Sequence, residues 1–186
     1  MMGTPANEWD GCFWRADVDE AAGALLEVIL EVRPAVLVTY DANGFYGHPD
    51  HIQAHRVAWR AFELADGLVR KFYATAVPKS VLAEAIKIMG GSGSDFMAVE
   101  SVDDLPFGVP DDQVTTQIDA AAYLDAKLAA MRAHASQIAV DSPFFALSDM
   151  VGQRALGHEY YTLLAGPRGP GGGAAGWESD LLAGLD

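Results

Sequence analysis

Tyrosine, histidine and aspartate side chains gather in one short stretch of the chain, residues 43–55, which reads NGFYGHPDHIQAH and holds three of the five histidines. Imidazole is the commonest neutral metal ligand in proteins. A carboxylate beside a histidine fixes the tautomer of its ring, and a tyrosine hydroxyl can donate to a developing oxyanion. Metal-assisted hydrolysis is therefore one chemistry open to this stretch, and its candidate residues are Tyr46, His48, Asp50 and His51.

The spacing of these histidines does not by itself choose between a functional and a structural role. His51 and His55 lie four residues apart, as in the H-E-x-x-H metalloproteases, but Ile52 stands where that motif needs its glutamate. A helix start that carries surface histidines explains the same letters, so both interpretations stay open for His48 and His51. For His55 and the two histidines outside the stretch, we expect core or surface positions rather than ligand roles.

The elements that would position this stretch follow from the hydrophobic pattern. Asp17, with Glu20 three residues later, is typical of a helix N-terminus, and Pro34 would end that helix. Pro49 suits the first position of a second helix. The pattern predicts helices over residues 17–33, 49–65, 78–89 and 120–136, and strands over residues 35–40, 68–77, 114–118 and 158–166.

Alternation of strands and helices is typical of an α/β domain with a parallel sheet. We therefore predict a Rossmann-like, mostly parallel sheet with flanking helices. The β-branched run at residues 35–40 is expected to be buried on both faces, and the candidate residues follow its end, where open sheets bind ligands. Such a domain normally opens with a strand, so we expect its first strand or strands to be missing from this sequence.

Composition narrows the class of protein. The length of 186 residues suits one domain. A formal charge of −14 with only 12 basic residues argues against nucleic acid and against an anionic membrane surface. Cys12 is the only cysteine, which favours a cytoplasmic protein without disulfides. Residues 167–186 are rich in glycine and proline and are predicted to be a disordered tail.

The segment VTYDANGFYGHPDHIQAH, residues 38–55, resembles the second signature of the LmbE-like zinc deacetylases, the PIG-L family of N-acetylglucosaminyl-phosphatidylinositol de-N-acetylases. The opening of the chain and the segments AKLAAMRAHASQIAV and HEYYTLLAG are similar to this family as well. The resemblance covers residues 1–166, which we expect to be an LmbE-like deacetylase domain, and it leaves out the tail.

The resemblance implies a role for each candidate residue. His51 matches the zinc-binding histidine of the motif, and His48 the histidine that assists as a charged or acid group. Asp50 matches the carboxylate partner of that histidine, and Tyr46 the tyrosine that helps to polarise the acetyl carbonyl. The family's first signature, an Ala-His-Pro-Asp-Asp-Glu type of stretch that supplies further zinc ligands and the general base, is not found in the sequence. Since catalytic zinc usually has three protein ligands, His51 alone would not complete the site.

The activity implied is the zinc-dependent hydrolysis of the N-acetyl group of N-acetylglucosaminyl-inositol, a small-molecule substrate in mycothiol biosynthesis. The glycine at position 47 favours this branch of the family. The alternatives are a mycothiol S-conjugate amidase or another LmbE-like sugar N-deacetylase, and a non-catalytic remnant of such an enzyme. The remnant would lack tight, stoichiometric zinc binding, which distinguishes it from the enzymes.

Overall fold

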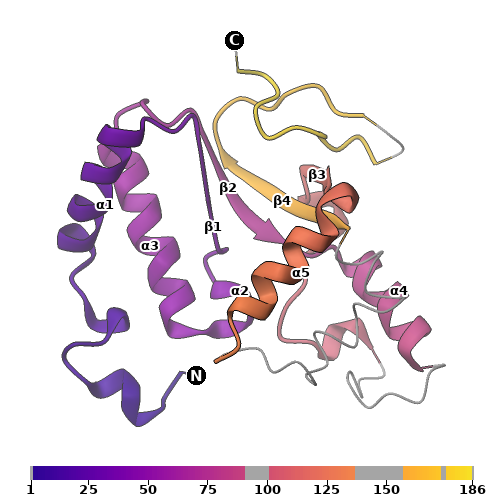
Figure 1. Cartoon of the computed structure of the whole chain (residues 1–186), viewed down its shortest axis with the longest axis horizontal. Helices are drawn as coiled ribbons and strands as arrows, with labels where there is room; N and C mark the ends of the chain where they lie inside the picture. The colour runs from indigo at the N-terminus through magenta and orange to yellow at the C-terminus, as the bar shows by residue number, and fades with distance from the viewer. Residues whose placement is uncertain (1, 91–100, 137–156, 173–174, 186) are drawn as a thin grey trace.

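The computed structural model describes residues 2–90, 101–136, 157–172 and 175–185 as an α/β arrangement with one four-stranded sheet (Figure 1). This confirms the predicted α/β class with flanking helices. The helices are α1 (Val18–Val32), the short turn α2 (Gly44–Gly47), α3 (Pro49–Leu64), α4 (Lys79–Gly90) and α5 (Leu124–Ala133). The strands are β1 (Val36–Thr39), β2 (Lys71–Ala76), β3 (Thr116–Asp119) and β4 (His158–Ala165).

The strand order in the sheet is β1-β2-β4-β3, and only β1 and β2 pair in parallel. Strand β4 runs antiparallel to both β2 and β3. The prediction of a mostly parallel sheet is therefore wrong for the described strands. An apolar run indicates a strand but not its direction, and of the predicted parallel pairings only the one across the β1–α3–β2 unit is found.

Strand β1 lies at the edge of the described sheet, and this position corrects a second expectation. Val38 is 41% exposed, so β1 is not buried on both faces within the described residues. Its far edge leaves backbone groups that a further strand could pair with. What matters for the site is that β1 hydrogen-bonds to the buried strand β2, which fixes the direction in which the chain leaves at Thr39.

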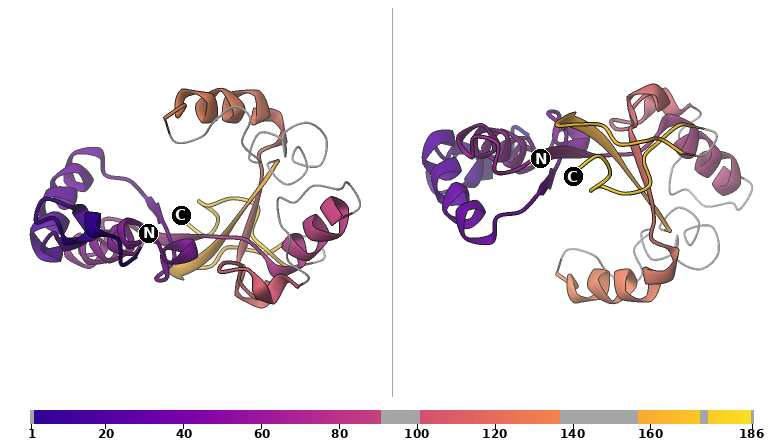
Figure 2. Two further views of the ribbon diagram at one scale, coloured as in Figure 1. Left: turned by 90° about the horizontal axis from the view of Figure 1, so that it is seen from below. Right: turned by 90° about the horizontal axis from the view of Figure 1, so that it is seen from above.

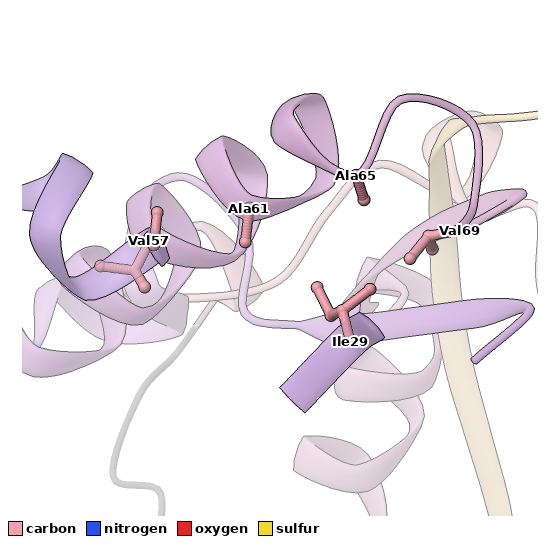
Figure 3. Close-up of a cluster of buried hydrophobic side chains, with 6 residues drawn as sticks. Ile29, Val57, Ala61, Ala65 and Val69 are labelled. Carbon is pink, nitrogen blue, oxygen red and sulfur yellow. The ribbon is translucent and has the colours of Figure 1, made fainter. Parts of the chain in front are cut away.

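Helices α1 and α3 pack together and form the main hydrophobic core (Figure 3). Asp17 caps α1 by accepting a hydrogen bond from the Glu20 N–H at 2.9 Å, as the sequence predicts. The helix ends at Val32 because Arg33 adopts a left-handed conformation before Pro34. The buried members of the core are Ala22, Ile29, Val57, Ala61, Ala65 and Val69.

Helix α4 lies at the other end of the molecule from α1 and α3 in both views of Figure 2, and α5 lies apart from these helices, beside the sheet. The predicted helix over residues 120–136 appears as α5 with a short 3-10 turn before it. None of its residues is fully buried among the described parts of the chain, although its leucine spacing suggests a buried stripe. The described helices include none that is long and apolar enough to cross a membrane.

The C-terminal segment packs on the sheet, so the predicted disorder does not hold for its described residues, 167–172 and 175–185. Glu178 is 1% exposed and forms an ion pair with Lys71 of β2 at 2.9 Å. The same carboxylate accepts hydrogen bonds from Tyr73 of β2 at 3.0 Å and Thr116 of β3 at 2.8 Å. Strand β4 lies between β2 and β3, so this one side chain ties two non-adjacent strands together.

Candidate active site

The turn between β1 and α3 positions the candidate residues, and it depends on Gly44. This glycine has φ +64°, a conformation that L side chains rarely adopt, and it is buried. A Cβ at this position would lie 2.7 Å from the Ile52 nitrogen and 2.9 Å from the His51 Cβ. The absence of a side chain therefore lets the turn pass directly against the first turn of α3, where His51 lies.

The ring of His51 is held by two contacts that the sequence does not reveal. Its Nδ1 lies 3.3 Å from the Gly44 carbonyl oxygen, and its ring stacks on Tyr40, with centroids 3.9 Å apart and planes 4° apart. A carbonyl oxygen only accepts, so Nδ1 must carry the hydrogen. In the neutral ring, the lone pair then lies on Nε2, as it does in a histidine prepared to bind a metal.

His48 carries its hydrogen on the opposite nitrogen. It is the N-cap residue of α3, and its Nδ1 accepts the Asp50 backbone N–H at 3.2 Å. Nδ1 is therefore the unprotonated nitrogen, and in the neutral ring Nε2 is an N–H donor. Burial and the nearby charge of His51 lower the pKa of His48, while Asp50 acts in the other direction. These contacts favour a neutral His48.

Tyr46 and Asp50 complete the group predicted from the sequence, and the structure brings all four residues together. The Tyr46 ring meets His51 and His48 edge-on, with centroids 5.4 Å and 5.9 Å apart. Tyr46 is 36% exposed, so it is not enclosed by the described residues. Asp50 is exposed in the first turn of α3 and contacts His48 through its backbone N–H.

His55 has a structural role in the described residues. Its Nδ1 lies 2.8 Å from the Tyr40 carbonyl oxygen, which ties α3 to the end of β1. Its ring stacks on Trp59 at 6.4 Å and meets Phe72 edge-on, so it belongs to the packing between α3 and the sheet. It also borders an open hollow of about 350 Å³ whose other lining residues are Asp41, Ala42, Trp59 and Leu164.

A zinc ion fits this site in part. His51 offers one nitrogen lone pair and a fixed ring, and His48, Tyr46 and Asp50 lie close by. Among the described residues, however, no group of three or more His, Cys, Asp or Glu side chains is placed to hold a metal ion. A zinc ion bound through His51 would therefore need further donors from outside the described part of the chain.

Gly44 and Tyr40 are the contacts of the site that sequence reasoning missed. The Asn-Gly pair at positions 43 and 44 is a visible signal for a turn. Nothing in the sequence, however, indicates that the glycine carbonyl meets the imidazole that lies seven residues further along the chain. Tyr40 looks like the last residue of a strand, and only the folded turn brings His51 onto its ring.

No family model matches the chain. Curated proteins do match it over its whole length, residues 167–186 included. It is 58% identical to a protein of Thermomonospora curvata and 56% identical to one of Acidothermus cellulolyticus. It is also 53% identical to a protein of Thermobispora bispora. All three are named 1D-myo-inositol 2-acetamido-2-deoxy-alpha-D-glucopyranoside deacetylase.

The chain spans about two thirds of the length of these relatives, 66%, 64% and 68% respectively. Identity above half over the whole chain is far more than a shared motif would give. The resemblance drawn from residues 38–55 is thereby confirmed. The chain belongs to the family of 1D-myo-inositol 2-acetamido-2-deoxy-alpha-D-glucopyranoside deacetylases.

Proposed function

We propose that this chain carries part of the active site of an amidohydrolase that removes the N-acetyl group of 1D-myo-inositol 2-acetamido-2-deoxy-alpha-D-glucopyranoside, the compound in the names of its relatives. The observation that carries the proposal is the complementary state of two adjacent imidazoles. His51 offers a lone pair on Nε2, while His48, with its ring centroid 4.5 Å away, offers an N–H on Nε2. Amide hydrolysis needs a Lewis acid, which a metal ion held by the lone pair would supply, and a hydrogen-bond donor beside it.

His51 is the residue that would hold zinc, through Nε2. Its Nδ1–H to the Gly44 carbonyl is the kind of outer contact that fixes the tautomer of a metal-binding histidine. Zinc, when bound, would supply the Lewis acid that polarises the acetyl carbonyl and activates a water molecule. Zinc dependence and the role of His51 are both parts of the proposal.

His48 and Tyr46 would stabilise the negative charge that develops on the acetyl oxygen. The Nε2–H of His48 and the hydroxyl of Tyr46 are both donors, and both rings lie within 6 Å of His51, measured between centroids at 4.5 Å and 5.4 Å. The resemblance implies a charged or acid His48. Protonation at Nδ1 would cost the bond from the Asp50 N–H, so we propose a neutral donor instead. Asp50 would limit how far the pKa of His48 falls.

The substrate is a small molecule, and the charge of −14 supports the absence of nucleic-acid binding. We also propose a cytoplasmic location, which the single cysteine supports. A mycothiol S-conjugate and other N-acetylated amino sugars are the competing substrates.

The test is a chimera in which this chain replaces the matching residues of the Thermomonospora curvata relative. The purified chimera is incubated with zinc and each of the competing substrates, and acetate or amine release is measured. We expect acetate release from the amino-sugar inositol to exceed release from the other substrates. A folded chimera that cleaves a mycothiol S-conjugate faster would make the chain an amidase. A folded chimera that cleaves none of them would make it a non-catalytic relative.

A further inference from the structure

Tyr40 is anchored through its backbone as well as through its ring. Its carbonyl oxygen accepts from His55 Nδ1 at 2.8 Å, which ties the residue to the second turn of α3. Its ring lies face to face with His51 in the first turn, with centroids 3.9 Å apart. Because the backbone is fixed at one side and the ring at the other, Tyr40 limits the rotation of the His51 ring plane.

The carbonyl group of Gly44 is fixed by its own neighbours. The Gly44 N–H donates to the Asp41 carbonyl at 2.9 Å, and the next N–H, from Phe45, donates to the Asp41 carboxylate at 2.9 Å. Phe45 has φ +67° and ψ −72°, a strained conformation for a bulky residue. Its ring stacks on Phe107 at 4.8 Å, which helps to hold the turn.

We propose that Tyr40 and Gly44 are positioning residues for His51, and that they set its ring plane and its tautomer before any ligand binds. Stacking on Tyr40 fixes the plane but leaves two orientations related by a flip of the ring. The Gly44 carbonyl selects the orientation in which Nδ1–H faces the turn. The two contacts are therefore complementary, and together they leave the lone pair of Nε2 in one place.

This inference deepens the proposed function, because a fixed lone pair matters only if His51 binds a ligand. Its test does not depend on activity. The metal-free chain is labelled with 15N at histidine, and long-range 15N–1H spectra identify which nitrogen of each ring carries hydrogen. The proposal expects His51 as a single Nδ1–H tautomer, with ring protons shifted upfield by the stacked Tyr40 ring.

Three variants separate the two contacts. Tyr40→Phe keeps an aromatic ring and should keep both the upfield shift and the single tautomer. Tyr40→Leu should lose the upfield shift. Gly44→Ala, whose Cβ would lie 2.7 Å from the Ile52 nitrogen, should lose the single tautomer and give a mixture of both.

Either of two results overturns the inference. One is a wild-type His51 with its hydrogen on Nε2, which needs no variant to be observed. The other is a folded Gly44→Ala chain in which His51 remains entirely Nδ1–H. The His48 signals in the same spectra should keep their Nε2–H form in Tyr40→Leu and serve as an internal control. Failure of the chimera to release acetate, in contrast, would remove the proposed function and leave these spectra unaffected.

Discussion

The imidazoles of His48 and His51 lie with centroids 4.5 Å apart and carry their hydrogens on opposite nitrogens. Each tautomer is imposed by the backbone: an N–H of α3 meets Nδ1 of His48, and a carbonyl of the preceding turn meets Nδ1 of His51. The first turn of α3 thus presents a lone pair beside a donor. If both rings carried the hydrogen on the same nitrogen, their Nε2 atoms could not offer one lone pair and one N–H donor.

Replacement of His48 should lower turnover and leave bound zinc in place. His48→Ala removes the Nε2–H donor and also the helix cap, which costs about 1 kcal/mol of stability. His48→Asn is the matched variant, because asparagine is a good N-cap residue but has no imidazole. In the chimera, we expect both variants to lower kcat by about 10²–10³ and only His48→Ala to lower the melting temperature. Loss of zinc in His48→Asn would show that His48, and not His51 alone, holds the metal.

Tyr46→Phe tests the hydroxyl without disturbing the packing of the ring. The phenyl ring can keep the edge contacts with His51 and His48, so the turn should retain its shape. We expect kcat of the chimera to fall about 10²-fold, as when one oxyanion donor is lost, with KM little changed. Tyr123→Phe is the control, because Tyr123 is 70% exposed and belongs to another element. Equal effects of the two variants would contradict a specific role for Tyr46.

Glu178 should be essential to stability although it lies in the glycine-rich segment. Glu178→Ala leaves the ammonium group of Lys71 buried without its partner, which typically costs about 3–5 kcal/mol. Asp103→Asn breaks an exposed ion pair with Lys79 and should cost less than about 1 kcal/mol. Urea unfolding of the wild-type chain and of these two variants measures the difference. Similar losses in both variants would mean that the C-terminal segment does not tie β2 to β3.

The same carboxylate predicts how stability depends on pH. Burial alone would raise the pKa of Glu178, but hydrogen bonds from Lys71, the Gly169 N–H and Thr116 outweigh it and hold the pKa below the ordinary value of 4.5. The folded state therefore favours the ionised form. Its contribution is complete above pH 4.5 and is lost as the pH falls through the lower, folded-state pKa.

Melting temperatures of the wild-type chain and of Glu178→Gln, measured between neutral pH and pH 3, test this dependence. We expect a large difference at neutral pH that shrinks steadily below pH 4.5. A difference that is constant over this range would show that the carboxylate is protonated or unpaired in the folded protein.

The sequence predicts the part of the fold that local signals control. Asp17, Pro34 and Pro49 mark helix ends through capping and proline geometry, and the structure places α1 and α3 accordingly. The direction of β4 is not a local property, because an apolar run can pair with a neighbouring strand in either direction. The packing of residues 167–172 and 175–185 was missed for a related reason. Glu178 meets its partner Lys71 across 107 positions of sequence, amid glycines that show no periodicity.

The candidate site, like the fold, could be predicted from the sequence only in part. Residue types and the family motif identify Tyr46, His48, Asp50 and His51, and the turn does bring them together. Their hydrogen-bond states could not be predicted, because each depends on a backbone group whose direction the fold sets. His48 illustrates the limit: the resemblance implies a charged or acid group, but a sequence motif does not show that its Nδ1 accepts a backbone N–H in the fold.

The most direct test of this account is the zinc content of the chimera, measured by elemental analysis after dialysis, with and without His51→Ala. If the Nε2 lone pair of His51 is a zinc ligand, the parent chimera should hold one zinc ion per chain. The folded His51→Ala chimera should then lose that zinc together with acetate release. A folded His51→Ala chimera that keeps both its zinc and its activity would contradict the assignment of this histidine and the complementary pair built on it.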